Sequence, residues 1–103
     1  MKPPPYGAEV AAELSTRNVD PEWLDRMLAI ALQVAARHGV PCPYAPEYGI
    51  QCTGEIYMTL PVDVSHDEAA MLGIEFAIEM YTLIPDFPAE HIAADITRRR
   101  RDD

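Results

Sequence analysis

Apolar side chains return every three or four positions between residues 20 and 38, which is the spacing of one helix face. Asp20 can cap the free backbone N–H groups at the start, and Pro21 suits the first helical position. Gly39 supplies a left-handed stop, and Pro41 cannot continue a helix. The pattern therefore predicts a surface helix with one face in the core. Its core-facing residues are Trp23, Met27, Ile30, Ala31 and Val34.

A second helix is predicted over residues 65–84, and it is apolar in nearly every direction. Ser65 and Glu68 form an S-x-x-E capping box, in which each side chain satisfies a backbone N–H group of the other residue. The polar stripe of this helix consists of Glu68, Glu75 and Glu79. We expect the central helix of the fold, covered on most sides by other elements or by a second subunit. Gly73 costs about 1 kcal/mol in such a helix and indicates that another backbone packs close there.

Two short segments, 48–51 and 55–60, flank a turn that contains Gly54. A three-residue loop with Gly54 in the left-handed conformation predicts a β-hairpin in which Ile50 lies opposite Ile56. One face of the hairpin is then apolar and packs on the helices: Tyr48, Ile50, Ile56, Met58 and Leu60. The hairpin edges are available to another chain, because a strand edge carries unpaired backbone groups.

Shorter amphipathic helices are predicted over residues 8–17 and 87–99, the second from the apolar residues Ile92 and Ile96. The fold class is therefore α+β: a mostly helical small domain in which two main helices flank a β-hairpin, with shorter N- and C-terminal helices. Along the chain we expect a disordered, proline-rich start (1–7), a single α+β domain (8–97) and a polar, arginine-rich tail (98–103).

Composition favours one folded domain, because 49% of the 103 residues are hydrophobic and only 24% are charged. The start of the chain has no apolar run after its charge, and no later stretch approaches the roughly 18 apolar residues of a membrane span. We therefore expect a soluble, cytoplasmic protein with no membrane partner. In that compartment Cys42 and Cys52 are expected to be reduced thiols.

The charge of the chain is strongly one-signed. The formal net charge is -9 at pH 7, and the sixty residues 38–97 contain ten Asp or Glu and no Lys or Arg. Such a field favours a basic protein or nucleoprotein complex as partner and opposes direct nucleic-acid binding. The run of four arginines at 98–101 is expected to be a short solvated tail, because Asp102 and Asp103 dilute its charge.

A metal site would have to draw on four residues with the spacing H-x3-C-x9-C-x13-H: His38, Cys42, Cys52 and His66. Structural zinc prefers ligands in pairs two to four residues apart, and neither cysteine has a close cysteine partner. We therefore expect no metal and no cofactor.

Enzymatic activity finds little support in the sequence. Catalysis by a nucleophile needs a thiol or hydroxyl beside a base that a third group orients. On a helix over 87–99, His91 and Asp95 would lie four residues apart, so that His91 could be the base and Asp95 the group that orients it. An exposed surface contact is the commoner outcome of such a spacing. The adjacent carboxylates Asp67 and Glu68 are explained by the helix start that they occupy. We therefore predict that the protein is not an enzyme.

Three interpretations of the acidic surface remain: solubility alone, a binding face for a basic protein, and mimicry of a nucleic acid. In size, acidity and lack of catalytic motifs the chain is similar to small phage and mobile-element inhibitors of CRISPR effectors and restriction enzymes. A stripe from Glu68 to Glu79 spans about 16 Å, over which duplex DNA carries roughly ten phosphates. Three carboxylates are too sparse to imitate that, so mimicry requires further acids on the same side.

We therefore predict a non-catalytic acidic binding protein that inhibits or sequesters a basic, nucleic-acid-handling partner, of the anti-CRISPR or anti-restriction type. Its partner-binding residues are predicted to be Glu68, Glu75, Glu79, Glu47, Glu55, Asp63 and Asp86. The alternative is a helical homo-oligomer, such as a homodimer, that serves as an accessory or structural subunit. The two hypotheses differ in what covers the helix over 65–84.

Overall fold

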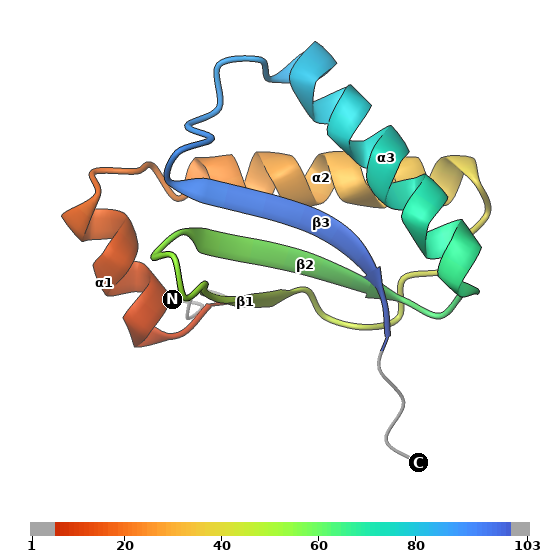
Figure 1. Ribbon diagram of the computed structural model, residues 1–103, viewed down its shortest axis with the longest axis horizontal. Helices are drawn as coiled ribbons and strands as arrows, with labels where there is room; N and C mark the ends of the chain where they lie inside the picture. The colour runs from red at the N-terminus through yellow and green to blue at the C-terminus, as the bar shows by residue number, and fades with distance from the viewer. Residues whose placement is uncertain (1–5, 100–103) are drawn as a thin grey trace.

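A computed structural model describes residues 6–99 of the chain (Figure 1). The elements follow in the order α1 (Ala8–Thr16), α2 (Glu22–Arg37), β1 (Glu47–Ile50), β2 (Ile56–Val62), α3 (His66–Leu83) and β3 (Ile92–Arg98). The predicted α+β class is confirmed, and the three helices lie within two residues of their predicted bounds.

The sheet has three strands in the order β1-β2-β3. β1 and β2 are antiparallel with Ile50 opposite Ile56, and Gly54 in the turn has φ 95°, so the predicted hairpin register is confirmed. β3 pairs with β2 in parallel, with Ile96 opposite Leu60. α3 provides the crossover between these two parallel strands, as a parallel pair requires.

The predicted helix over 87–99 is wrong, because this segment forms β3. Ile92 and Ile96 are buried, and Ala94 packs against the same core. A strand places alternate residues on one face, so an apolar pair four residues apart fits a strand as well as a helix. The predicted arrangement of two helices flanking a hairpin is not confirmed either, because α2 and α3 contact each other and both contact β3.

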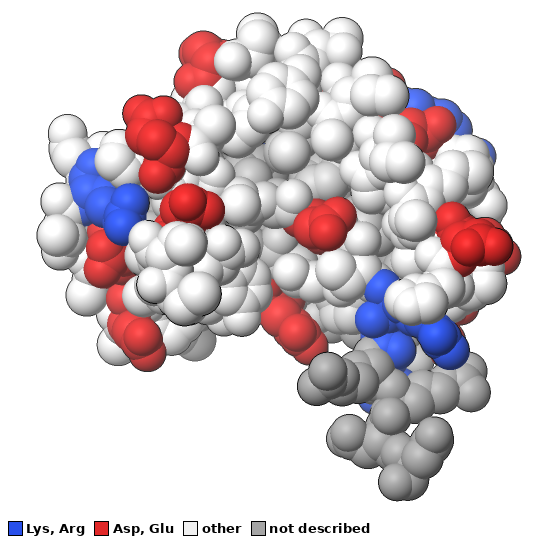
Figure 2. All heavy atoms as spheres, in the orientation of Figure 1, with Lys and Arg blue, Asp and Glu red and all other residues white. Residues whose placement is uncertain are grey.

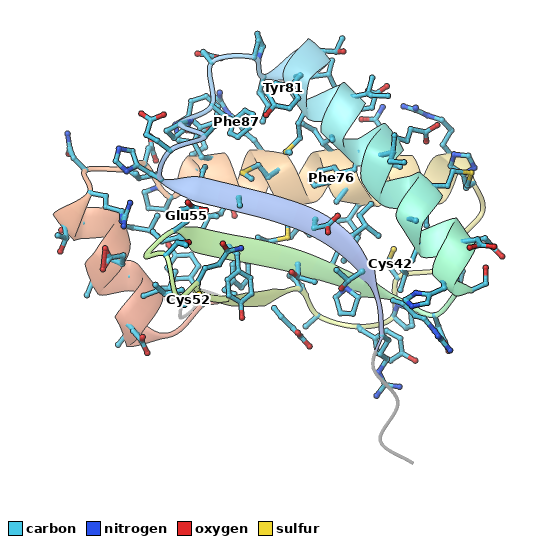
Figure 3. The ribbon with its side chains drawn as sticks, viewed as in Figure 1. Cys42, Cys52, Glu55, Phe76, Tyr81 and Phe87 are labelled. Carbon is cyan, nitrogen blue, oxygen red and sulfur yellow. The ribbon has the colours of Figure 1, made fainter. Side chains whose placement is uncertain are left out.

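The hydrophobic core lies between the three helices and one face of the sheet. Alternate residues of β2 reach into it, with Ile56, Met58 and Leu60 at most 1% exposed. α1 contributes Val10 and Leu14. The other buried apolar residues come mainly from α2, α3 and β3: Leu24, Met27, Ile30, Ala31, Val34, Leu72, Phe76, Met80, Ile92 and Ile96. Figure 3 shows Phe76 beneath α3, between this helix and the sheet.

The helix boundaries have the local causes that the sequence predicts. The Asp20 carboxylate accepts a hydrogen bond of 2.9 Å from the Glu22 backbone N–H group at the start of α2. Gly39, with φ 68°, follows the end of that helix. At the start of α3 the Ser65 hydroxyl accepts a bond of 3.2 Å from the Glu68 N–H group. The Glu68 carboxylate accepts a bond from the Ser65 hydroxyl instead of from the Ser65 N–H group, so only one half of the predicted capping box is present.

α3 approaches the backbone of β3 closely at Gly73, as predicted. A Cβ atom at this position would lie 3.7 Å from the Ile96 carbonyl oxygen and 3.0 Å from the Asp95 carboxylate. A larger side chain would therefore push the helix away from the strand. Gly73 consequently fixes the position of α3 over the outer edge of the sheet.

The ends of the predicted domain are only partly described. Arg98 closes β3, and the Arg99 N–H group donates a bond of 2.7 Å to the Val62 carbonyl while its guanidinium lies 4.1 Å from the centre of the Tyr44 ring. The rest of the predicted tail (100–103) and most of the predicted disordered start (1–5) lie outside the described residues. No helix within residues 6–99 is long and apolar enough to cross a membrane.

Candidate functional site

The acidic stripe of α3 is partly neutralised by the end of α2. The Arg37 guanidinium lies 3.3 Å from the Glu79 carboxylate and 3.8 Å from that of Glu75, and His38 Nε2 is 2.7 Å from Glu75. The side chains of Glu75 and Glu79 are 31% and 25% exposed. Both carboxylates therefore face α2, and they hold the two helices together instead of forming an uncompensated patch.

The other predicted partner-binding acids are spread over the molecule. Glu68 is exposed at the start of α3, where its carboxylate accepts a bond from the Ser65 hydroxyl. Glu55 and Asp63 lie just beyond opposite ends of β2, Glu47 opens β1, and Asp86 is exposed between α3 and β3. Figure 2 shows acidic atoms in several separate groups on the visible face. The structure thus does not gather these seven residues on one surface, and their role in binding stays a prediction.

An exposed apolar surface runs along α3 instead. Met71, Ile74, Ile78 and Tyr81 are 46%, 65%, 60% and 60% exposed, and their spacing places them on one side of the helix. Ala70 and Ala77 lie on the same side. We call this set the α3 stripe: Ala70, Met71, Ile74, Ala77, Ile78 and Tyr81. Other elements of the described chain therefore leave one side of this helix uncovered, and its cover by a second subunit, the alternative that the sequence left open, stays a prediction.

Two open grooves border the α3 stripe. One, of about 580 Å³, lies between α3 and β3, and Ala70, Ile74, Ala77 and Ile96 are among its lining residues. The other, of about 460 Å³, follows the opposite flank of the stripe between Met71 and Ile78. Figure 2 shows mostly uncharged atoms over α3 and over the hollow between α3 and β3. The stripe is therefore a ridge between two shallow depressions.

The free edge of β3 is poorly suited to pairing with another strand. The Ile96 N–H group points away from β2 and donates a hydrogen bond of 2.8 Å to the Asp95 carboxylate. The Ile96 carbonyl lies under the close approach of α3 at Gly73. Capping by a charged side chain and cover by a helix both discourage the addition of another strand. A protein that docks here would therefore contact α3 instead of extending the sheet.

The candidate catalytic residues are not arranged for catalysis of the predicted kind. His91 and Asp95 do not lie on a helix: Asp95 is in β3, and His91 directly precedes this strand. Arg17 instead lies 3.1 Å from His91 Nδ1, 2.9 Å from the Glu13 carboxylate and 2.7 Å from the Gly54 carbonyl oxygen. This contact ties α1 to the hairpin turn and to the start of β3, which is a structural role.

The residues considered for a metal site do not come together. In the part of the chain that the structure describes, no three His, Cys, Asp or Glu side chains form a group of metal ligands. Both cysteines are free, and Figure 3 shows Cys42 and Cys52 on opposite sides of the molecule. Partial burial raises the pKa of the Cys42 thiol, which makes it less reactive than an ordinary cysteine.

Comparison with known proteins adds no assignment to this geometry. No family model matches the chain, and neither the curated proteins nor the solved structures contain a match. The surface chemistry of the described residues is therefore the basis for assigning a function.

The α3 stripe is the feature that sequence reasoning missed as a site. The signal was present, because residues 69–84 are apolar on more sides than a small domain can bury. The sequence did not reveal which side is left outside. That side is opposite the position where Leu72 and Phe76 enter the core.

Proposed function

We propose that this protein is a non-catalytic binding protein that docks another protein chain on the α3 stripe. The observation that carries the proposal is the exposure of Ile74, Ile78 and Tyr81, each at least 60% exposed on one helix face. Contiguous apolar surface of this kind on a small domain is typical of an interaction site. Aromatic and methionine side chains, here Tyr81 and Met71, are enriched at such sites.

The chemistry of the stripe suits contact better than catalysis. Its six residues carry no carboxylate, imidazole or thiol; Asp67 lies just before the stripe on the same side of α3, and Glu75 and Glu79 are paired with Arg37. His91, a general base by type, is held by Arg17 at the other end of the sheet. We propose the cytoplasm as the compartment of action, because Cys42 and Cys52 are both free thiols.

Retention of a binding partner tests this function. Tagged protein with Ile74→Lys and Ile78→Lys should fail to retain the proteins that the unmodified protein retains from an extract of its host. The matched control is Leu32→Lys, because Leu32 is an exposed aliphatic residue, at 41%, on the other main helix. Circular dichroism should show the same fold in all three proteins. Equal retention by the double variant would contradict docking on the stripe.

A second candidate function makes charge the main driver of binding. In this version the protein inhibits or sequesters a basic, nucleic-acid-handling partner, and the observation in its favour is the net charge of -9 with no Lys or Arg in residues 38–97. Reversal of the exposed acids Glu47, Glu68 and Asp86 to Lys should then abolish binding. Association should also slow steeply as salt rises. Binding insensitive to both changes would exclude this candidate.

A further inference from the structure

We infer that the occupant of the α3 stripe is a second copy of this chain, with the two α3 helices packed antiparallel about Ile74. The inference rests on the proposed function for the choice of docking surface and adds the identity of the partner. It rests on three properties of the stripe: its spacing, the match of its side chains under reversal, and its lack of charge.

The spacing of the stripe is that of a helix–helix seam. Starting at Asp67, positions on this side of α3 recur in alternating steps of three and four: Asp67, Ala70, Ile74, Ala77 and Tyr81. A repeat of 3.5 residues keeps one helix face against a partner helix over its whole length. Met71 and Ile78 lie next to Ala70 and Ala77 and widen the seam on the side away from β3.

When two copies of α3 pack antiparallel, side chains of similar size lie opposite each other. If Ile74 of each copy meets Ile74 of the other, Ala70 lies opposite Ala77 and Met71 lies opposite Ile78 of the second copy. The alanines allow the two backbones to approach closely on the side of the β3 groove, and the large side chains fill the space on the other side. A twofold axis repeats each of these contacts, so one surface serves both copies.

The two ends of the stripe complement each other in the same arrangement. Asp67 and Tyr81 are fourteen residues apart, which is nearly four turns and about 21 Å. Within the described residues neither the Asp67 carboxylate nor the Tyr81 hydroxyl has a hydrogen-bond partner. The Tyr81 ring is held in place by Phe87, with ring centres 5.4 Å apart (Figure 3). In the antiparallel pair each Tyr81 hydroxyl can donate to the Asp67 carboxylate of the other copy.

Charge favours a second copy over a strongly basic occupant at this surface. The six residues of the stripe are uncharged; Asp67 lies beyond one end, and Glu75, which borders the groove beside Met71, is paired with Arg37, as is Glu79. Two copies with a net charge of -9 repel each other over most of their surfaces, and the stripe is a place where they meet without opposing acids at the centre. Antiparallel packing also places the positive start of each helix beside the negative end of the other.

The oligomeric state tests this inference. A standard interface buries about 800 Å² per partner, which is about an eighth of the 6556 Å² surface of this chain, and the stripe is narrow, so we expect a dimer that dissociates at micromolar concentration. Sedimentation equilibrium should show a monomer–dimer equilibrium for the unmodified protein. Ile74→Lys places two like charges at the axis and should weaken dimerisation by about a hundredfold or more. Leu32→Lys should leave it unchanged.

A thiol at the axis gives a second readout that does not depend on the lysine variant. With Cys42→Ser and Cys52→Ser as background, Ile74→Cys should form a disulfide-linked dimer on mild oxidation, because the axis brings the two introduced thiols together. Leu32→Cys in the same background should form no disulfide-linked dimer. Equal cross-linking of both variants would overturn the pairing.

Salt separates this inference from a charge-driven partner. Dimerisation should tighten as salt rises, because screening reduces the repulsion between the two acidic copies. A protein that stays monomeric at all concentrations and salt levels would overturn the second copy as occupant, while retention of a different protein through Ile74 and Ile78 would still support the proposed function. A dimer that Ile74→Lys leaves intact would also overturn the inference.

Discussion

The two main helices of this protein, α2 and α3, differ in how much of their apolar surface is buried. α2 buries its apolar face and turns charged residues such as Glu22 and Arg26 to the solvent. α3 buries Leu72 and Phe76 but leaves Ile74 more exposed than covered. α2 leaves one large apolar side chain exposed, Leu32, whereas α3 leaves a continuous row of them.

The difference lies in where the polar side of each helix points. The acids Glu75 and Glu79 of α3 face α2, where Arg37 and His38 meet them, so the polar side of α3 is used between two helices. The side with Ile74 and Ile78, opposite the buried residues Leu72 and Phe76, is left to the solvent. A helix whose acids pair with a neighbouring helix while a row of its apolar side chains is exposed is typical of an element that contacts another chain.

The largest expected effect contrasts a buried with an exposed side chain. Met27→Ala in α2 removes a fully buried residue and should lower the free energy of unfolding by about 2–5 kcal/mol. Ile78→Ala in α3 should change it by no more than about 0.5 kcal/mol in dilute solution. Urea unfolding followed by circular dichroism measures both values. A loss of several kcal/mol for Ile78→Ala in the monomer would mean that the stripe belongs to the core.

A smaller effect is expected where α3 meets β3. Gly73→Val adds atoms against β3, where a Cβ atom alone would lie 3.0 Å from the Asp95 carboxylate and 3.7 Å from the Ile96 carbonyl oxygen. Overpacking of this kind costs about 1–3 kcal/mol. Thermal unfolding of this variant should therefore occur at a clearly lower temperature. The control is Ala29→Val at an exposed position of α2. It should lower the stability only by the small difference in helix propensity between Ala and Val.

A still smaller effect is expected at the contact between the two helices. Arg37→Ala removes the cation beside Glu75 and Glu79, whose side chains are partly exposed, so the cost should be about 0.2–1 kcal/mol. A double-mutant cycle with Glu79→Gln measures the coupling directly. No coupling would mean that the two helices are held together by apolar packing alone.

The smallest effect concerns α2 and β1 and appears only at high pH. Burial, then the nearby Asp25 carboxylate and Tyr6, raise the pKa of Tyr48 above its ordinary value of 10.0. The unfolded chain then releases this proton at lower pH than the folded chain, so the stability from neutral Tyr48 is present below pH 10.0 and is lost as pH rises above it. Melting temperatures between pH 9 and pH 11 should fall more for the unmodified protein than for Tyr48→Phe. Parallel curves would contradict the raised pKa.

Sequence reasoning works here for elements whose signals are local. The caps at Asp20 and Ser65, the stop at Gly39 and the turn at Gly54 act over a few residues, and the structure confirms all four. The segment 87–99 was misassigned because its strand depends on pairing with β2, whose partner residues lie 36 positions earlier, as Ile56 does from Ile92. No local pattern reveals a parallel partner at that distance.

The candidate site was harder to predict, for the same reason. A helical wheel of α3 shows Glu68, Glu75 and Glu79 without a basic neighbour on their own helix, which suggested an open acidic stripe. Arg37 comes from α2, so the neutralisation is a tertiary contact and cannot be read from one helix. The excess of apolar residues on α3 was visible in the sequence, but which side is exposed depends on tertiary packing, of Gly73 against β3 and of the acidic side chains against α2.

The central claim is that α3 meets another chain and the outer side of α2 does not. Two-dimensional amide NMR spectra of the labelled protein, recorded from high to low concentration, test it most directly. We expect concentration-dependent shifts for the amides of Ala70, Ile74 and Ile78, and constant positions for those of Glu22, Arg26 and Leu32. Shifts centred on α2, or none at any concentration, would contradict the account.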